Sequence, residues 1–248
     1  MELGLSGRVA LVTGASKGIG RGIAAALAAE GAKVAVSSRS REGIDAAASE
    51  IGALPLVHDS ADLDAVPALL EEVERGLGPV DIAVTNTGGP PAGDPLGFDR
   101  EQWSAAYRNL VLGPMAIVER VVPGMRERGF GRIVSVSSSA VREPIPGLIL
   151  SNSHRAALLG ALKTLAREVA RDGVTVNSVL PGRIATDRIL EMAGSREAAE
   201  RAAAEQVPAG RLGTVEELAA VAAFLCSEQA SYVTGTAVLV DGGLTQSV

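Results

Sequence analysis

The stretch Thr13-Gly14-Ala15-Ser16-Lys17-Gly18-Ile19-Gly20 decides the fold of this chain. An apolar run, residues 9–12, precedes it, and a helix-like segment, residues 21–30, follows it. A short buried strand that turns through glycines into a helix N-terminus exposes backbone N–H groups, and these groups bind phosphate. The glycines permit the tight turn and let a pyrophosphate approach the backbone. The residues that we expect to contact a dinucleotide here are Gly14, Ser16, Lys17, Gly18, Ile19 and Gly20.

The rest of the chain alternates between short apolar, β-branched segments and longer helical patterns. The expected strands lie near residues 9–12, 33–37, 54–57, 81–84, 132–136, 175–179 and 237–240. The expected helices lie near residues 21–30, 42–51, 62–77, 99–128, 152–171, 186–205 and 214–227. This alternation predicts a parallel sheet with helices on both faces. We therefore expect one α/β domain, residues 1–248, with a Rossmann-type, doubly wound sheet of seven strands.

Residues 183–210 interrupt this rhythm between the sixth and seventh expected strands. The segment is rich in arginine, glutamate and alanine, which is typical of a solvated helix pair. A mobile lid over a substrate cleft is the functional alternative. The sequence leaves both interpretations open.

The composition excludes several classes of partner. The chain has 248 residues, 47% of them hydrophobic, and a net charge of -6, which argues against nucleic acid and anionic membranes. No apolar stretch approaches the length of a membrane span, and no basic leader followed by an apolar run is visible. The single cysteine, Cys226, lies in an apolar helical pattern, so we expect a buried thiol and a cytoplasmic protein. No constellation of metal ligands is visible.

The end of the second expected strand distinguishes between the two nicotinamide dinucleotides. A site for NAD usually carries an acid about 20 residues after the glycines, which binds the ribose hydroxyls. Here the strand ends with Ser37-Ser38-Arg39 and no carboxylate. Arg39 can pair with a 2′-phosphate, Ser38 can add a hydroxyl, and Lys17 adds charge. We therefore expect NADP(H) in preference to NAD(H); ordinary solvated surface is the alternative for both cations.

Further motifs follow the glycine loop in a characteristic order. They are Asp59, Thr85-Asn86-Thr87-Gly88, Asn109, Ser137-Ser138, Pro181-Gly182 with Thr186, Tyr232-Val233-Thr234-Gly235 and Val240-Asp241-Gly242-Gly243. With these motifs the chain resembles the short-chain dehydrogenase/reductase family over essentially its whole length, and within it the 3-oxoacyl-[acyl-carrier-protein] reductases. The resemblance implies cofactor contacts from Asp59, Ser60, Asn86, Gly88, Pro181, Gly182, Ile184 and Thr186.

The resemblance also implies partners. It predicts a homotetramer, built partly from the helices near 99–128 and 152–171 and from the C-terminal strand. It also predicts a small-molecule carbonyl or alcohol substrate. A carrier protein is a further candidate partner. It would need a basic surface, for which Arg126, Arg128 and Arg132 are the candidates.

The catalytic pattern of the family is only half present. The family uses an asparagine, a serine, a tyrosine and a lysine four residues after the tyrosine. Asn109 and Ser138 match, but Ser151 stands at the tyrosine position and Arg155 at the lysine position. The pKa of an aliphatic hydroxyl lies several units above that of a phenol, which is about 10, so Ser151 is not an equivalent acid. Arg155 keeps the positive charge on the same helical face and can hold the cofactor's ribose hydroxyls.

The source of the proton is therefore open, with water, Ser151 as a bridge, His154 and Tyr107 as candidates. Arg142 and Glu143 are expected to overlook the nicotinamide pocket and are candidate substrate ligands.

Two functions follow as alternatives. One is an NADP(H)-dependent oxidoreductase with an altered proton relay, and the other is a nearly inactive dinucleotide-binding homologue that serves as a sensor or assembly partner. A lyase or isomerase reaction on the same scaffold is a third.

Overall fold

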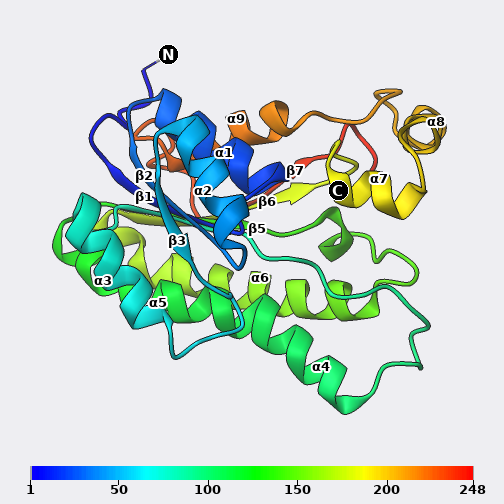
Figure 1. Ribbon diagram of the computed structural model, residues 1–248, viewed down its shortest axis with the longest axis horizontal. Coiled ribbons are helices and arrows are strands. Elements are labelled where there is room, and N and C mark those ends of the chain that lie inside the picture. Colours follow the sequence, from blue (N-terminus) through cyan, green and yellow to red (C-terminus); the bar gives the residue numbers. More distant parts are fainter. Residues whose placement is uncertain (1, 248) are drawn as a thin grey trace.

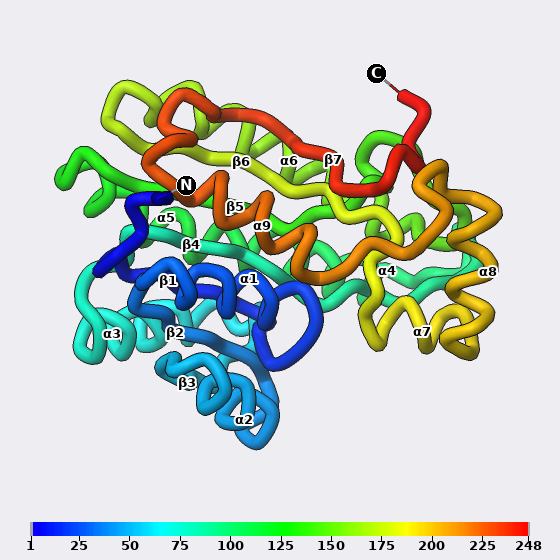
Figure 2. The backbone as a smooth tube through the Cα atoms, turned by 90° about the horizontal axis from the view of Figure 1, so that it is seen from above, coloured from blue at the N-terminus to red at the C-terminus, as the bar shows by residue number. Residues whose placement is uncertain are grey.

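The computed structural model describes residues 2–247 and contains one parallel sheet of seven strands. The strands lie in the order β3-β2-β1-β4-β5-β6-β7, which Figure 2 shows from above. The order reverses between β1 and β4, which pair directly. The strands are β1 (Val9–Thr13), β2 (Lys33–Ser38), β3 (Leu54–Val57), β4 (Ile82–Thr85), β5 (Gly131–Val136), β6 (Val174–Pro181) and β7 (Ala237–Val240). This architecture confirms the predicted Rossmann-type fold.

Helices cover both faces of the sheet (Figure 1). One apolar core joins the sheet to α1 (Gly18–Ala29), α2 (Arg41–Ile51) and α9 (Val215–Cys226). A second core joins the other face to α3 (Val66–Leu77), α5 (Gly113–Glu127) and α6 (Ile149–Val169). Cys226 is fully buried in the first core, and burial raises the pKa of its thiol to about 12, so the expected inert core residue is confirmed.

The helical pattern predicted over residues 99–128 is continuous but not uniform. It consists of α4 (Arg100–Tyr107), a π-helical turn over Arg108–Leu112, and α5. Gly113 follows the π turn where the helix passes close to the β3 loop, because a Cβ at Gly113 would lie only 2.0 Å from the Ser60 carbonyl oxygen. π turns often occur at functional sites, and this one contains Asn109.

Two short helices follow β6, where the sequence departs from the regular alternation of strands and helices. They are α7 (Asp187–Ala193) and α8 (Arg196–Gln206), which share a small apolar cluster with residues before α9. Both helices stand beyond the carboxyl ends of the strands (Figure 1), the edge at which ligands bind in open parallel sheets. Within residues 2–247, no helix is both long and apolar enough to cross a membrane.

Candidate functional site

A cleft runs along the carboxyl ends of the strands and consists of two adjoining cavities. The first, of about 560 Å³, lies beside β5, β6 and α7, and we call it the substrate cavity. The second, of about 900 Å³, lies beside the ends of β2 and β3, and we call it the adenosine cavity. Both are lined by Lys17, Asn86, Thr87, Gly88 and Gly89, which mark where they meet. An elongated molecule bound at this edge would therefore pass the glycine loop at its middle.

Three glycines of the glycine loop are required for two different reasons. Gly14 and Gly18 have φ angles of 59° and 57°, which favour glycine. A Cβ at Gly20 would lie 2.4 Å from the Gly14 carbonyl oxygen. Gly20 thus lies beneath the loop and lines neither cavity, so its smallness serves packing rather than the close approach of a pyrophosphate expected from the sequence. Helix α1 begins at Gly18, so its unpaired N–H groups do face the cleft.

Asn86 ties the glycine loop to the end of β4. Its side-chain amide donates to the Gly14 carbonyl oxygen at 2.9 Å, and its backbone exchanges two hydrogen bonds with the Thr13 hydroxyl at 2.9 and 3.0 Å. These bonds couple the two loops that flank the switch point of the sheet. The predicted cofactor residues Asn86 and Gly88 accordingly line both cavities.

The adenosine cavity contains the residues predicted to distinguish NADP from NAD. Arg39 is exposed at its rim, and within residues 2–247 no carboxylate pairs with it. The Ser38 hydroxyl donates to the Ser40 carbonyl oxygen at 3.2 Å, so it is already engaged. Ser16, Asp59 and Ser60 line the same cavity. The free guanidinium of Arg39 is therefore the chief cationic group at this end.

Lys17 is turned away from this end of the cleft. Its ammonium group lies 3.1 Å from the Asp187 carboxylate at the start of α7, and that hydrogen bond raises the pKa of Lys17. Both side chains are mostly exposed, so the pair is weak. Lys17 thus links the glycine loop to α7 instead of supplementing Arg39.

The substrate cavity brings together Ser138, Ser151 and Arg155. The Arg155 Nε donates to the Ser151 Oγ at 3.1 Å, and its Nη1 donates to the Val136 carbonyl oxygen at 3.0 Å. Burial, and secondly the charge of Arg188, lower the pKa of Arg155 to about 10, so it stays charged at neutral pH. Because its oxygen accepts from Arg155, the Ser151 hydroxyl hydrogen is free to point at a ligand.

The remaining predicted residues of this half lie around the same cavity. They are Gly18, Ile19, Pro181, Gly182, Ile184 and Thr186. Asn109, in contrast, lines the adenosine cavity, and its amide donates to the Gly88 carbonyl oxygen at 3.0 Å. The four residues expected to form one catalytic group are therefore divided between the two cavities.

Neither His154 nor Tyr107, the two alternative side chains for proton donation, reaches the substrate cavity. The His154 ring packs against Trp103 and Tyr107, with ring centroids 5.4 and 5.9 Å away. Its Nδ1 lies 2.6 Å from the Leu150 carbonyl oxygen. His154 and Tyr107 thus contact each other between α4 and α6, and neither of them lines the substrate cavity. The hypothesis that either of them supplies the proton is not supported by this geometry.

Glu143 lines the substrate cavity, whereas Arg142 does not. The Glu143 carboxylate accepts hydrogen bonds from the backbone N–H groups of Gln246 and Ser247, at 2.6 and 2.7 Å. The C-terminal segment therefore becomes a wall of the cavity, through Leu244 and Thr245. The sequence offers no local signal for this contact, because the paired residues are about a hundred positions apart.

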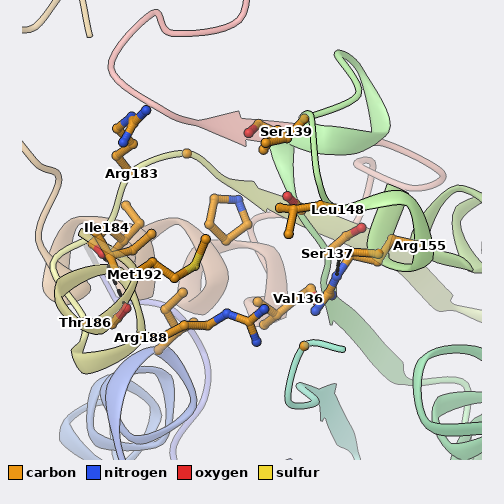
Figure 3. A pocket seen from close by; sticks show the side chains of 18 of the residues that line it. Val136, Ser137, Ser139, Leu148, Arg155, Arg183, Ile184, Thr186, Arg188 and Met192 are labelled. Carbon is orange, nitrogen blue, oxygen red and sulfur yellow. Dashed lines mark hydrogen bonds between the residues drawn. The ribbon is translucent and has the colours of Figure 1, made fainter. Parts of the chain in front are cut away.

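The sequence also gave no indication of Arg188. This residue extends from the first turn of α7 across the substrate cavity (Figure 3). Its Nη2 lies 3.4 Å from the Pro90 carbonyl oxygen, and its guanidinium covers Gly89, where a Cβ would collide with it. Ile189 and Met192 of the same helix line the cavity as well, so α7 is not simply a solvated helix.

The basic surface proposed for a carrier protein does not form. Arg126 and Arg128 lie 2.6 and 3.4 Å from the carboxylates of Asp172 and Asp81. Arg132 is 3% exposed, and its guanidinium donates to the Ser227 carbonyl oxygen. The three arginines therefore serve the local structure at the far ends of the strands.

Comparisons with known proteins agree with this fold and cleft. Residues 14–245 match the family model described as enoyl-(acyl carrier protein) reductase. The chain is 36% identical to the 3-oxoacyl-[acyl-carrier-protein] reductase FabG of Escherichia coli (strain K12), over 98% of this chain and 99% of that protein. It is 35% identical to the gluconate 5-dehydrogenase of Gluconobacter oxydans (strain 621H), over 98% and 97% of the two chains.

Solved structures are similar over the same extent. The L-sorbose reductase from Gluconobacter frateurii, complexed with NADPH and L-sorbose, has a TM-score of 0.94 and 34% identity, and all of both chains is covered. An actinorhodin polyketide ketoreductase with NADPH has a TM-score of 0.92 and 32% identity, with 96% of this chain and 97% of that chain covered. By the family model, by sequence identity and by structural similarity over nearly its whole length, this chain belongs to the short-chain dehydrogenase/reductase family of oxidoreductases.

Proposed function

We propose that the protein is an NADP(H)-dependent oxidoreductase that acts on a carbonyl or alcohol group of a small molecule. The observation that carries the proposal is the continuous cleft, in which Arg39, the glycine loop and the Ser138–Ser151–Arg155 cluster follow one another. The absence of a carboxylate at the end of β2 supports NADP(H) over NAD(H). The sorbose reductase and the polyketide ketoreductase, which are similar throughout, were both solved with NADPH.

The residues of the substrate cavity would handle the oxygen of the substrate. The nicotinamide, when bound, supplies or accepts the hydride. Ser138 and Ser151 offer hydroxyl hydrogens to the substrate oxygen, and the hydrogen bond from Arg155 to the Ser151 oxygen leaves the Ser151 hydrogen free for this purpose. In the reduction, the carbonyl carbon receives the hydride and the carbonyl oxygen receives a proton. A water molecule would supply this proton through the Ser151 hydroxyl. Asn109 would support the relay indirectly, by holding the Gly88 carbonyl.

A nearly inactive dinucleotide-binding homologue, a sensor or an assembly partner, is the second candidate. One observation favours it: no histidine, tyrosine or cysteine is among the described residues that line the substrate cavity. Losing a positioned acid typically lowers a rate by about 10²–10⁴. A cleft that binds NADPH and turns over very slowly would fit this role.

Two measurements on the pure protein separate these candidates. Fluorescence titration with NADPH and NADH tests the cofactor, and a clear preference for NADH would contradict the proposal. Absorbance of NADPH with a panel of 3-oxoacyl thioesters, ketoses and simple ketones tests turnover. Oxidation of NADPH above the protein-free rate supports the oxidoreductase, whereas tight binding without turnover supports the inactive homologue.

The remaining proposals concern assembly and dynamics. We propose a homotetramer, as the family resemblance implies, which light scattering on the eluting protein tests. We also propose that residues 183–210 form a lid, because α7 bridges the glycine loop and the β4 loop through Asp187 and Arg188. Slower hydrogen exchange in this segment after NADPH is added would support the lid, and unchanged exchange would contradict it.

A further inference from the structure

Two guanidinium groups converge on the substrate cavity from opposite walls. Arg155 reaches it from α6, and Arg188 reaches it from the first turn of α7 (Figure 3). The two groups are close enough that the charge of Arg188 contributes to the lowered pKa of Arg155. Two like charges in a partly enclosed cavity repel each other, so this arrangement favours a ligand that carries negative charge.

No acid of the cavity neutralises this pair within residues 2–247. The Glu143 carboxylate is bound to the backbone of the C-terminal segment, and the Asp187 carboxylate faces Lys17. Among the described residues, the hydrogen-bond partners of Arg155 are the Ser151 hydroxyl and the Val136 carbonyl oxygen, both uncharged. The chain as a whole has a net charge of -6, so the positive charge is local to the cleft.

The free donors have the geometry that a carboxylate requires. A guanidinium carries five N–H donors in a planar fork, and the two bonds of Arg155 leave three of them unassigned. Arg188 has a single, long contact with the Pro90 carbonyl oxygen at 3.4 Å. Paired N–H groups bind the two oxygens of a carboxylate simultaneously. The hydroxyls of Ser138 and Ser151 lie in the same cavity, beside the position where a carbonyl would react.

We propose that the substrate is a small oxo or hydroxy acid, whose carboxylate is held by Arg188 and Arg155 while its reacting oxygen faces Ser138 and Ser151. The inference rests on the proposed function and adds the class of substrate to it. Ile145, Leu148 and Met192 line the same cavity and would contact the carbon chain of the acid. An alternative ligand for Arg188 is the diphosphate of the dinucleotide, because the guanidinium of Arg188 also covers Gly89, where the two cavities meet.

The test compares an acid with its uncharged counterpart. The full-length protein, saturated with NADP⁺, is titrated calorimetrically with 4-oxopentanoate and with methyl 4-oxopentanoate, and the titrations are repeated on the free protein. Arg188→Met removes the charge but keeps a long side chain. Arg183→Met is the matched control, because Arg183 belongs to the same cavity wall but bonds to Gln206 and points away from Arg155 (Figure 3).

We expect the unmodified protein to bind the acid at least about tenfold more tightly than the ester, since charge-assisted hydrogen bonds are strong. R188M should abolish this preference and leave the affinity for NADPH unchanged, whereas R183M should retain the preference. Equal affinity for acid and ester, including no measurable binding of either, would overturn the inference. So would an R188M protein that keeps the preference but binds NADPH about tenfold more weakly, because Arg188 would then serve the diphosphate. Either result leaves the proposed function standing, since NADPH binding and turnover are measured separately.

Discussion

If Ser151 and Arg155 stand in place of the family's tyrosine and lysine, as the resemblance implies, restoring that pair should raise the rate of turnover. In the double variant Ser151→Tyr, Arg155→Lys, a phenol would enter the substrate cavity, where Ser138 already lies. The lysine would replace the guanidinium whose Nε lies 3.1 Å from the Ser151 Oγ. The pKa difference between an aliphatic hydroxyl and a phenol corresponds to roughly 8 kcal/mol at about 1.36 kcal/mol per unit. Only part of this reaches the rate, since a positioned acid contributes about 10²–10⁴.

We therefore expect oxidation of NADPH with the most reactive simple ketone of the panel to rise by about 10²–10⁴. The assay is steady-state absorbance, with NADPH affinity measured in parallel by fluorescence. Ser153→Tyr is the control, because Ser153 is exposed on the same helix and its tyrosine would not enter the cavity. No increase in a double variant that still binds NADPH would refute the reasoning, because the missing phenol would then not be what limits the site.

Three further perturbations test other parts of the cleft. Arg39→Ser should weaken NADPH binding by about 10–100-fold and leave NADH binding unchanged, since it removes a charge-assisted contact to the 2′-phosphate; equal losses for both dinucleotides would contradict this. Gly20→Ala should lower the free energy of unfolding, measured in urea, by about 1–3 kcal/mol, because its Cβ would lie 2.4 Å from the Gly14 carbonyl oxygen. Gly160→Ala is the control: Gly160 has open space around it, so this change should not lower the free energy of unfolding. Burial lowers the pKa of His58, so the unfolded chain binds a proton at this histidine first as the pH falls below about 6.5, and the stability of the folded protein should drop there. His58→Leu should reduce this drop in melting temperature, measured by thermal melts over a range of pH. An unchanged pH dependence would assign the loss of stability to other groups.

Local patterns predicted the elements well where a single physical requirement dominates. The apolar runs became parallel strands within two residues at each end, and β1, β4, β5 and β6 are buried throughout, because central strands of such a sheet are covered on both faces. The boundary of α1 was less accurate, since the glycine loop enters the helix at Gly18 rather than at Arg21. The π turn around Asn109 was not predictable, because it depends on how α4 and α5 pass the β3 loop at Gly113.

The roles of charged side chains depended most on distant partners. Lys17 was expected near a 2′-phosphate, but Asp187 draws it towards α7. Glu143 was a candidate substrate ligand, but its carboxylate holds the C-terminal segment. His154 lies three residues after Ser151 on the same helix, yet it packs against Trp103 outside the substrate cavity. In each case the decisive neighbour lies far away in the sequence, where spacing carries no information about distance.

The sequence by itself determined the sheet and the phosphate loop, and it is the basis of the prediction that Ser151 and Arg155 stand where the family has its acid–base pair. Those features depend on local periodicity, on turn chemistry and on residue identity at positions in register, all of which can be read along the chain. Only the tertiary structure decided which side chains share the substrate cavity. The folding of α7 and the C-terminal segment over the carboxyl ends of the strands sets Arg188 opposite Arg155, and charges separated along the chain interact only once that packing brings them together.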